Sequence, residues 1–320
     1  MRILLWHVHG SWTTAFVQGK HTYLMPVLPG RGPDGRGRAR TYSWPDSVVE
    51  VRPEDLPSAE IDCVVLQRPH ESDLLARWMP GMRRPVVYVE HNTPRGDVPD
   101  NRHPVADRDD LTLVHVTHFN DLFWDAGGTR SAVIEHGVPD PGPLYRGDLD
   151  RFAVAINEPV RRWRVTGTDL LPRFAAVAPL DVYGIGAADL PAALPPETRD
   201  RVAVHDDPPQ TTLHDAMALR RAYVHPMRWT SLGLSLIEAM TLGMPVLALA
   251  TTEAIEAVPA SAGVLSTRME TLLEAAHWLR DDPAAATAMG RQARTAALRR
   301  YNLDRFLADW DRLLLEVCTA

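Results

Sequence analysis

The sequence predicts an α/β fold with two doubly wound domains that face each other across a cleft, followed by a helical C-terminus. The length of 320 residues is enough for about two domains. Short apolar runs rich in β-branched residues alternate with helical segments in the first half of the chain and again in the second. Residues 139–150 separate the two blocks and are rich in proline and glycine, as a linker would be.

In the first block, apolar runs alternate with helical patterns. Several of these runs are apolar on both faces, as strands in a covered parallel sheet must be. We expect strands at Ile3–Val8, Tyr23–Leu28, Cys63–Gln67, Val86–Glu90, Leu111–Thr117 and Ala132–Glu135, and helices at Glu71–Trp78 and Phe119–Ala126. Residues 29–40 are dense in Gly and Arg and predict a mobile surface loop. No clear helix is expected within residues 11–29.

The second block repeats the alternation and then becomes helical. We expect strands at Phe152–Ile156, Asp181–Ile185, Arg201–His205, Ala222–His225 and Pro245–Leu249, and helices at Gly167–Val177, Thr212–Arg221, Ser231–Leu242, Thr271–Leu279, Asp282–Arg299 and Leu303–Val317. The predicted domains are residues 1–145 and 146–302. The helix at 303–320 follows the second domain.

Composition excludes several classes of protein. The 34 Lys and Arg and 41 Asp and Glu give a net charge of −7, so no nucleic-acid partner is expected. No apolar stretch approaches the ~20 residues of a membrane span. The 2 cysteines cannot form a disulfide framework, and Cys63 lies in an apolar run that predicts a buried thiol in a reducing compartment. Together with an arginine-rich composition typical of GC-rich genomes, these features indicate a bacterial, cytoplasmic protein.

Histidines recur where the strands of the first block end. The carboxyl ends of parallel strands bind ligands in open α/β sheets. The histidines concerned are His7, His9, His91, His115, His118 and His136. One such histidine alone is more often structural, but their convergence on one sheet edge favours a functional role for the group. A metal-dependent hydrolase is one hypothesis, because His7 and His9 together with His91, His115 or Glu90 offer zinc ligands.

The most informative segment is residues 223–250, which predicts a strand, a tight turn, a helix and a second strand. Ser231 or Thr230 is expected to cap the helix. The backbone N–H groups of Leu232, Gly233 and Leu234 would then be available to an anion. Glu238 lies one turn further on, where its carboxylate would accept hydrogen bonds from the paired hydroxyls of a ribose. The sequence therefore predicts a nucleotide site on this helix.

This segment resembles the sugar-nucleotide signature of retaining GT-B glycosyltransferases, the family-4-like group. The matching residues are Thr230-Ser231-Leu232-Gly233, Glu238-Ala239-Met240 and Gly243-Met244-Pro245-Val246. Glu238 corresponds to the second glutamate of the family's Glu-x7-Glu pair. Thr230 stands where the family has its first glutamate, which faces the donor sugar.

The resemblance extends weakly along the rest of the chain. Residues 153–171 resemble the start of the family's C-terminal domain, and this places Arg161, Arg162 and Arg164 near the donor diphosphate. Gly10 and Ser11 match the family's glycine loop on the acceptor side. The resemblance also implies that the helix at 303–320 crosses back to the first domain, although its apolar residues fit the core of the second domain equally well. His91 matches the histidine that faces the acceptor, and His118 is a second catalytic candidate of this kind.

The resemblance implies transfer of a sugar from a nucleoside-diphosphate sugar to a small-molecule or glycan acceptor, with retention and without a metal or other cofactor. A second hypothesis is a GT-B protein that binds a sugar nucleotide but does not transfer the sugar, because Thr230 stands where the family has a glutamate. A third hypothesis is contact with anionic lipid head groups of a membrane. The basic residues available for it are Arg31, Arg36, Arg38, Arg40, Arg83 and Arg84. No apolar face accompanies these charges, which favours an ordinary solvated loop.

Overall fold

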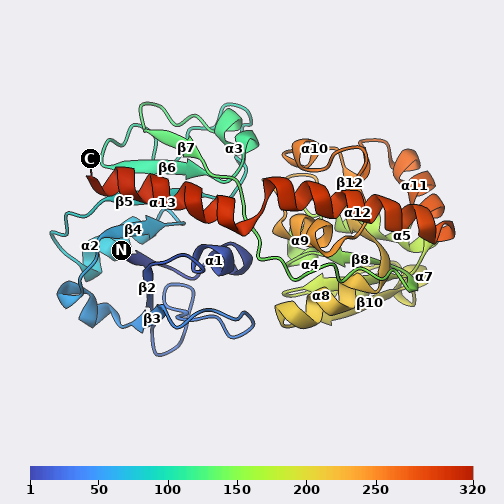
Figure 1. Ribbon diagram of the computed structural model, residues 1–320, viewed down its shortest axis with the longest axis horizontal. Helices are drawn as coiled ribbons and strands as arrows, with labels where there is room; N and C mark the ends of the chain where they lie inside the picture. The colour runs from blue at the N-terminus through green and yellow to red at the C-terminus, as the bar shows by residue number, and fades with distance from the viewer. Residues whose placement is uncertain (320) are drawn as a thin grey trace. The chain divides into compact units, whose positions relative to one another are not determined.

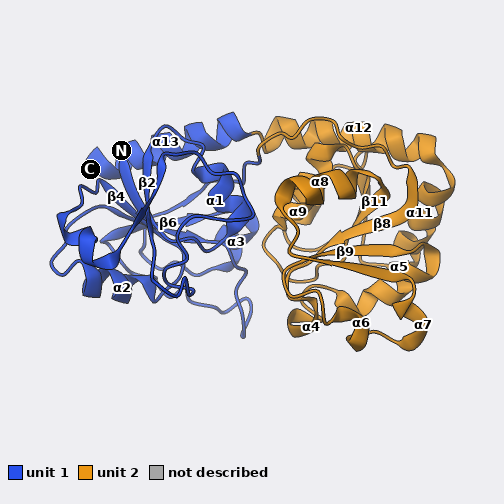
Figure 2. Cartoon of the chain, turned by 90° about the horizontal axis from the view of Figure 1, so that it is seen from below, with its two compact units in different colours: residues 1–138, 303–320 blue, residues 139–302 orange. Residues whose placement is uncertain are grey.

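The computed structural model describes residues 1–319, which fold as two α/β units (Figure 2). Unit 1 contains residues 1–138 and the chain from Leu303 onward, and unit 2 contains residues 139–302. Each unit is built on one parallel sheet covered by helices (Figure 1).

Unit 1 has a seven-stranded sheet in the order β3-β2-β1-β4-β5-β6-β7. Its strands are β1 (Arg2–Leu5), β2 (Thr22–Pro26), β3 (Val48–Val51), β4 (Cys63–Leu66), β5 (Val86–Glu90), β6 (Leu111–His115) and β7 (Ser131–Val133). Its helices are α1 (Gly10–Phe16), η1 (Pro53–Ser58), α2 (Glu71–Trp78), α3 (His118–Phe123) and α13 (Leu303–Thr319). β4 and β6 are buried along their whole length, as expected for strands covered on both faces.

Unit 2 has a six-stranded parallel sheet in the order β10-β9-β8-β11-β12-β13. Its strands are β8 (Leu149–Ala155), β9 (Leu180–Gly184), β10 (Val202–Asp206), β11 (Arg220–His225), β12 (Val246–Leu249) and β13 (Gly263–Ser266). Its helices are α4 (Pro159–Arg162), η2 (Thr168–Leu170), α5 (Leu171–Val177), α6 (Leu190–Ala193), α7 (Pro196–Arg199), α8 (Gln210–Ala218), α9 (Leu234–Leu242), α10 (Ala254–Ala257), α11 (Met269–Asp281) and α12 (Pro283–Arg300).

The segment that follows unit 1 is tied to unit 2 by hydrogen bonds. The backbone N–H of Tyr145 donates to Leu242 O at 3.0 Å, and that of Gly147 donates to Ala218 O at 3.1 Å. Asp140 pairs with Arg294 of α12 at 2.7 Å. Unit 2 therefore begins at Pro139 rather than at the predicted residue 146.

The last helix packs on the aromatic face of α1. Trp310 is 1% exposed, and its ring lies 5.7 Å from the ring of Trp12 and 5.0 Å from that of Phe16. The expectation that residues 11–29 lack a helix is wrong for α1. Its apolar face carries large aromatic side chains that α13 covers, a long-range contact that local periodicity does not reveal.

The glycine- and arginine-rich loop after β2 is anchored rather than free. Arg31 pairs with Glu50 at 2.8 Å, and the guanidinium of Arg38 donates to Trp44 O at 2.8 Å. Val27 and Arg36 form an isolated antiparallel bridge. The prediction of a loop at residues 29–40 holds, but the expected mobility does not fit these bonds. Among residues 1–319, no helix is both long and apolar enough to cross a membrane.

The packing of α13 predicts a large loss of stability on truncation of Trp310. Trp310→Ala is expected to lower the free energy of unfolding by about 3–5 kcal/mol, because it leaves a cavity between α13 and α1. Trp278→Ala is the control, since Trp278 is 46% exposed on α11, and it is expected to change this value by about 0.5 kcal/mol. Urea denaturation measures both, and equal losses in the two variants would contradict the packing described.

Candidate functional site

The carboxyl ends of β8 and β11 mark the point in unit 2 where the chain changes direction in the sheet. These strands are neighbours, but the chain leaves β8 toward β9 and β10 and later returns to β11 and β12 (Figure 1). Open α/β sheets bind ligands at such a point. The loop before α9 and the loop before α4 follow these two strands, so both predicted donor-binding segments belong to this edge.

α9 begins later than predicted. Its N-cap is Gly233, and no side chain caps it, so the expected capping by Ser231 or Thr230 is wrong. Leu232 and Gly233 precede the helix, and the amides of its first turn are those of Leu234, Ser235 and Leu236. The chain before the helix is held elsewhere, since Ser231 O accepts from Glu253 N at 3.4 Å.

Gly233 is needed because His225 lies directly against it. A Cβ at position 233 would be 2.6 Å from His225 Cε1. His225 ends β11 and is 3% exposed, and burial lowers the pKa of its imidazole to about 4. The ring is therefore neutral at neutral pH and supports the start of α9 without adding a charge.

A short chain of hydrogen bonds fixes the first turn of α9 to the sheet. The hydroxyl of Tyr223 donates to Ser235 Oγ at 2.8 Å, and Ser235 Oγ donates to Ala155 O at 3.4 Å. Burial raises the pKa of Tyr223, so its hydroxyl stays protonated. The helix N-terminus is thus connected to both strands at the switch point. Sequence reasoning did not identify Tyr223 or Ser235.

Glu238 is buried among polar partners and not in packed hydrocarbon. Its side chain is 8% exposed, Gln210 Nε2 donates to its Oε1 at 2.9 Å, and His214 Nε2 lies 3.9 Å from its Oε2. Gln210 and His214 are one turn apart on α8, which packs against α9. Sequence reasoning identified Glu238 but missed these two residues. Their spacing of four residues on one helix is the signal that could have found them.

The predicted arginines lie in the loop and short helix after β8. Arg161 donates to Glu158 at 2.9 Å and Arg164 donates to Asp169 at 3.0 Å, and both arginines are largely exposed. Arg162 is the last residue of α4. The structure thus brings all three to the carboxyl edge of the unit 2 sheet, but it gives two of them acidic partners within the same segment.

This loop packs directly on the one that precedes α9. Gly167 has φ +70°, and a Cβ there would be 1.8 Å from Pro226 O. The backbone N–H of Arg228 donates to Val165 O at 2.9 Å, and its guanidinium holds Asp169. The two segments therefore form one connected surface at the end of β8 and β11.

In unit 1 the corresponding switch point lies between β1 and β4. The rings of His9 and His91 lie 4.0 Å apart there, and His91 Nε2 lies 3.0 Å from Gln67 Oε1. Gln67 Nε2 donates to Trp6 O at 2.8 Å, so its Oε1 is the acceptor for His91. His91 therefore carries its proton on Nε2, and its Nδ1 is an acceptor.

Burial disfavours the charged form of two histidines in this cluster, His91 and His136. Burial lowers the pKa of His91 well below its usual value, and His9 and His136 lower it further. Burial also lowers the pKa of His136 to about 3. The other predicted residues of unit 1 differ in their surroundings. His118 is exposed at the start of α3, whereas Gly10 and Ser11 lie under Tyr42, whose hydroxyl is 3.4 Å from Ser11 Oγ.

The histidines expected to hold zinc are divided among different partners. His7 Nδ1 donates to Gly37 O at 3.1 Å, and His91 is bound to Gln67. Glu90 accepts from His103 Nε2 at 3.0 Å. Within residues 1–319, no three His, Cys, Asp or Glu side chains are grouped as metal ligands. The structure therefore does not support the hydrolase hypothesis.

Solved structures show what this fold is. Sucrose-phosphate synthase from Thermosynechococcus elongatus is 14% identical and superposes with a TM-score of 0.75 over 99% of both chains. HepE from Anabaena, solved with UDP, is 15% identical with a TM-score of 0.71, over 99% of this chain and 100% of HepE. This chain has the GT-B fold.

A family model matches part of this chain. Residues 194–296 match the family described as glycosyl transferases group 1. The match contains both Gln210 and Glu238 and includes residues 230–246, which carry the resemblance to GT-B glycosyltransferases. S. aureus TarM, solved with fondaparinux, α-GlcNAc-glycerol and UDP, is 14% identical with a TM-score of 0.64 over 79% of this chain. The chain spans only 55% of TarM, and no curated protein sequence matches it.

The buried histidines of this GT-B chain predict acid sensitivity. An unfolded histidine titrates near 6.5, whereas His225 in the folded state titrates near 4. Between these values the unfolded chain binds more protons, so the free energy of unfolding falls as the pH falls. The loss is about 1.4 kcal/mol per pH unit for one such histidine.

Urea denaturation from pH 7.5 to 5.0 tests this expectation. His225→Gln is expected to make the pH dependence less steep below pH 6.5 by about 1.4 kcal/mol per unit. His277→Gln is the control, because His277 is exposed on α11, and it should follow the unsubstituted protein. A His225→Gln slope equal to that of the control would show that His225 is not buried as a neutral ring.

Proposed function

We propose that this protein transfers a sugar from a nucleoside-diphosphate sugar to a hydroxyl group of a small-molecule or glycan acceptor, with retention and without a metal. The observation that carries the proposal is the combination on α9 of an uncapped N-terminus and a buried carboxylate one turn further on. The group 1 family match over the same helix supports it. HepE has been solved with UDP-glucose, which makes a uridine donor the first to test.

The N-terminus of α9 suits the donor diphosphate. Negative charge grows on the leaving oxygen as the glycosidic bond to the diphosphate breaks. The first-turn amides from Leu234 to Leu236, held by Tyr223 and Ser235, would stabilise that charge without reorganising. Each well-placed donor of this kind contributes about 3 kcal/mol to transition-state stabilisation.

Glu238 suits the ribose of the same nucleotide. Its Oε1 accepts a hydrogen bond from Gln210. A carboxylate has about four acceptor sites, so the same group would also accept from the 2′ and 3′ hydroxyls. Arg161 and Arg164 would reach the diphosphate only by exchanging Glu158 and Asp169 for phosphate oxygens, so the backbone amides carry more of this role. Arg162, the last residue of α4, is the third arginine that we propose to contact the diphosphate.

Retention is proposed to follow from attack on the face that the diphosphate leaves. The bond from the anomeric carbon to the β-phosphate oxygen breaks, a bond to the acceptor oxygen forms, and the acceptor proton passes to the departing diphosphate. His91, neutral and with Nδ1 as acceptor, would position the acceptor hydroxyl in unit 1. The catalytic role of His118 stays a prediction.

One observation favours a second candidate function, the binding of a sugar nucleotide without transfer. Thr230 precedes α9, and the resemblance of residues 230–246 to the family signature places there the glutamate that faces the donor sugar, so on that correspondence this chain lacks one carboxylate of the pair. Turnover with a broad acceptor set separates the two functions, because a protein of the second kind would bind the nucleotide and form no product.

Glu238→Gln tests the nucleotide site. We expect the dissociation constant for the preferred diphosphate among UDP, GDP, TDP and ADP to rise about 10- to 100-fold, since charge-assisted hydrogen bonds to the ribose are weakened. Isothermal titration calorimetry measures it. The control is Glu274→Gln on the exposed part of α11, which should bind as the unsubstituted protein does. Unchanged affinity in Glu238→Gln would refute the site.

Product analysis tests the chemistry. With the preferred donor we expect product of the same anomeric configuration as the donor, determined by NMR of the anomeric proton. Removal of divalent metal ions with EDTA should leave the rate unchanged, because amides and arginines take the place of a metal. An inverted product would refute retention, and a rate that falls with EDTA and returns with added metal would refute metal independence.

A further inference from the structure

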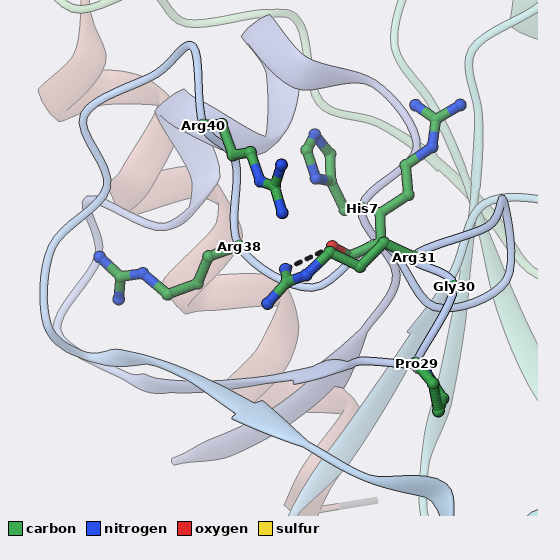
Figure 3. A pocket seen from close by; sticks show the side chains of 7 residues that line it. His7, Pro29, Gly30, Arg31, Arg38 and Arg40 are labelled. Atoms are coloured by element: carbon green, nitrogen blue, oxygen red, sulfur yellow. Dashed lines mark hydrogen bonds between the residues drawn. The ribbon is translucent and has the colours of Figure 1, made fainter.

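A basic pocket lies in unit 1, beside the end of β1. Its volume is about 430 Å³, and the residues that line it are His7, Pro29, Gly30, Arg31, Arg36, Arg38 and Arg40 (Figure 3). The lining thus contains four arginines and no acidic residue. The whole chain has a net charge of −7, so this concentration of positive charge runs against the overall balance.

Two of the four arginines shape the pocket. Arg31 donates to both carboxylate oxygens of Glu50, at 2.8 and 3.0 Å, which neutralises its charge. Arg38 donates to Trp44 O and Pro45 O at 2.8 and 3.0 Å, and Figure 3 shows its guanidinium pointing away from His7. These bonds close the loop on itself and account for the positions of both side chains.

The backbone of this loop is equally constrained. Gly37 has φ +66°, and a Cβ there would be 2.3 Å from Glu50 Oε1. Gly37 O accepts from His7 Nδ1 at 3.1 Å. Burial lowers the pKa of His7, and Arg36 lowers it further, so the imidazole is a neutral wall of the pocket. The pocket is therefore formed before any ligand arrives.

Arg36 and Arg40 are the two lining arginines whose guanidinium groups take no part in these bonds. Both are exposed, and no carboxylate of residues 1–319 forms an ion pair with either guanidinium. Asp34, the acidic residue of the same loop, is already paired with Arg68 at 3.3 Å and with His70 at 2.9 Å. In Figure 3 the guanidinium of Arg40 is turned toward His7, into the pocket.

We propose that Arg36 and Arg40 bind a phosphate group in this pocket. Two guanidiniums without acidic partners, set beside two others in a fixed loop, repel one another until an anion enters. A guanidinium binds phosphate oxygens through paired, charge-assisted hydrogen bonds, and two of them match the double charge of a phosphate monoester. The pocket faces the carboxyl edge of the sheet, since His7 follows β1 and Pro29 follows β2.

The chain that follows the pocket loop reaches Gly10, the first residue of α1. Tyr42 covers Gly10, where a Cβ would be 2.6 Å from Tyr42 Cε2, and its hydroxyl lies beside Ser11. The phosphate site therefore adjoins the side of unit 1 to which we assign the acceptor. On the proposed function, on which this step rests, the acceptor is a phosphorylated molecule held by its phosphate.

Phosphorus-31 NMR titration of the whole protein with inorganic phosphate at low ionic strength tests the site. The double variant Arg36→Ala with Arg40→Ala is expected to raise the dissociation constant at least about tenfold, through loss of charge-assisted hydrogen bonds. The matched control is Arg83→Ala with Arg84→Ala, an exposed pair before β5 at the opposite edge of the same sheet. The control should change the constant less than about twofold, as expected when no direct contact is lost.

Equal effects of the two double variants would overturn the proposal, because general attraction to positive charge would then explain the binding. No effect of either would overturn it as well. Glu238→Gln separates this test from that of the donor site. A protein that binds phosphate through Arg36 and Arg40 but binds no nucleoside diphosphate would uphold the pocket and refute the transferase.

The same variants distinguish a soluble phosphate from a lipid headgroup. Sedimentation with vesicles of phosphatidic acid in phosphatidylcholine, compared with phosphatidylcholine alone, gives the answer. Binding to phosphatidic acid that is lost in the Arg36 and Arg40 variant would assign the site to a phospholipid. Phosphate binding without sedimentation would assign it to a soluble phosphomonoester. Vesicle binding reduced equally by the two double variants would count against the site.

Discussion

The buried carboxylate of Glu238 is the constraint on which the account of unit 2 depends. A charge removed from water must be compensated by hydrogen bonds. Gln210 Nε2 donates a hydrogen bond to Glu238 Oε1 at 2.9 Å, and His214 Nε2 lies 3.9 Å from Glu238 Oε2. On the proposed function, the hydroxyl groups of a ribose donate further hydrogen bonds to this carboxylate, at the helix whose N-terminus suits a diphosphate.

The switch point of unit 1 differs in its electrostatics, because buried neutral imidazoles lie there instead of a buried carboxylate. His9, His91 and His136 gather there, and burial keeps His91 and His136 uncharged by lowering the pKa of each. A neutral imidazole with a defined tautomer orients a hydroxyl group without attracting the diphosphate. Positive charge is concentrated instead in the separate pocket of Arg36 and Arg40. One unit thus has distinct places for a neutral reacting group and for an anionic one.

Local patterns predicted most of the fold, and long-range contacts account for what they missed. The helix at 71–78 and the strand at 86–90 have the expected bounds, since their periodicity is strong and their ends are marked. α1 was missed because its stability comes from Trp310, nearly 300 positions away in the sequence. Glu238 was found through its position one turn beyond the predicted start of the helix. Its partner Gln210 and the N-cap of α9 at Gly233 depend on contacts between elements that spacing does not encode.

The most direct test of the central claim is a crystal structure of the protein with UDP, or with whichever diphosphate binds best. The account predicts that the ribose hydroxyls donate hydrogen bonds to Glu238 and that phosphate oxygens lie within hydrogen-bonding distance of the amides of Leu234, Ser235 or Leu236. A nucleotide bound elsewhere, with no ribose hydroxyl bonded to Glu238, would contradict it.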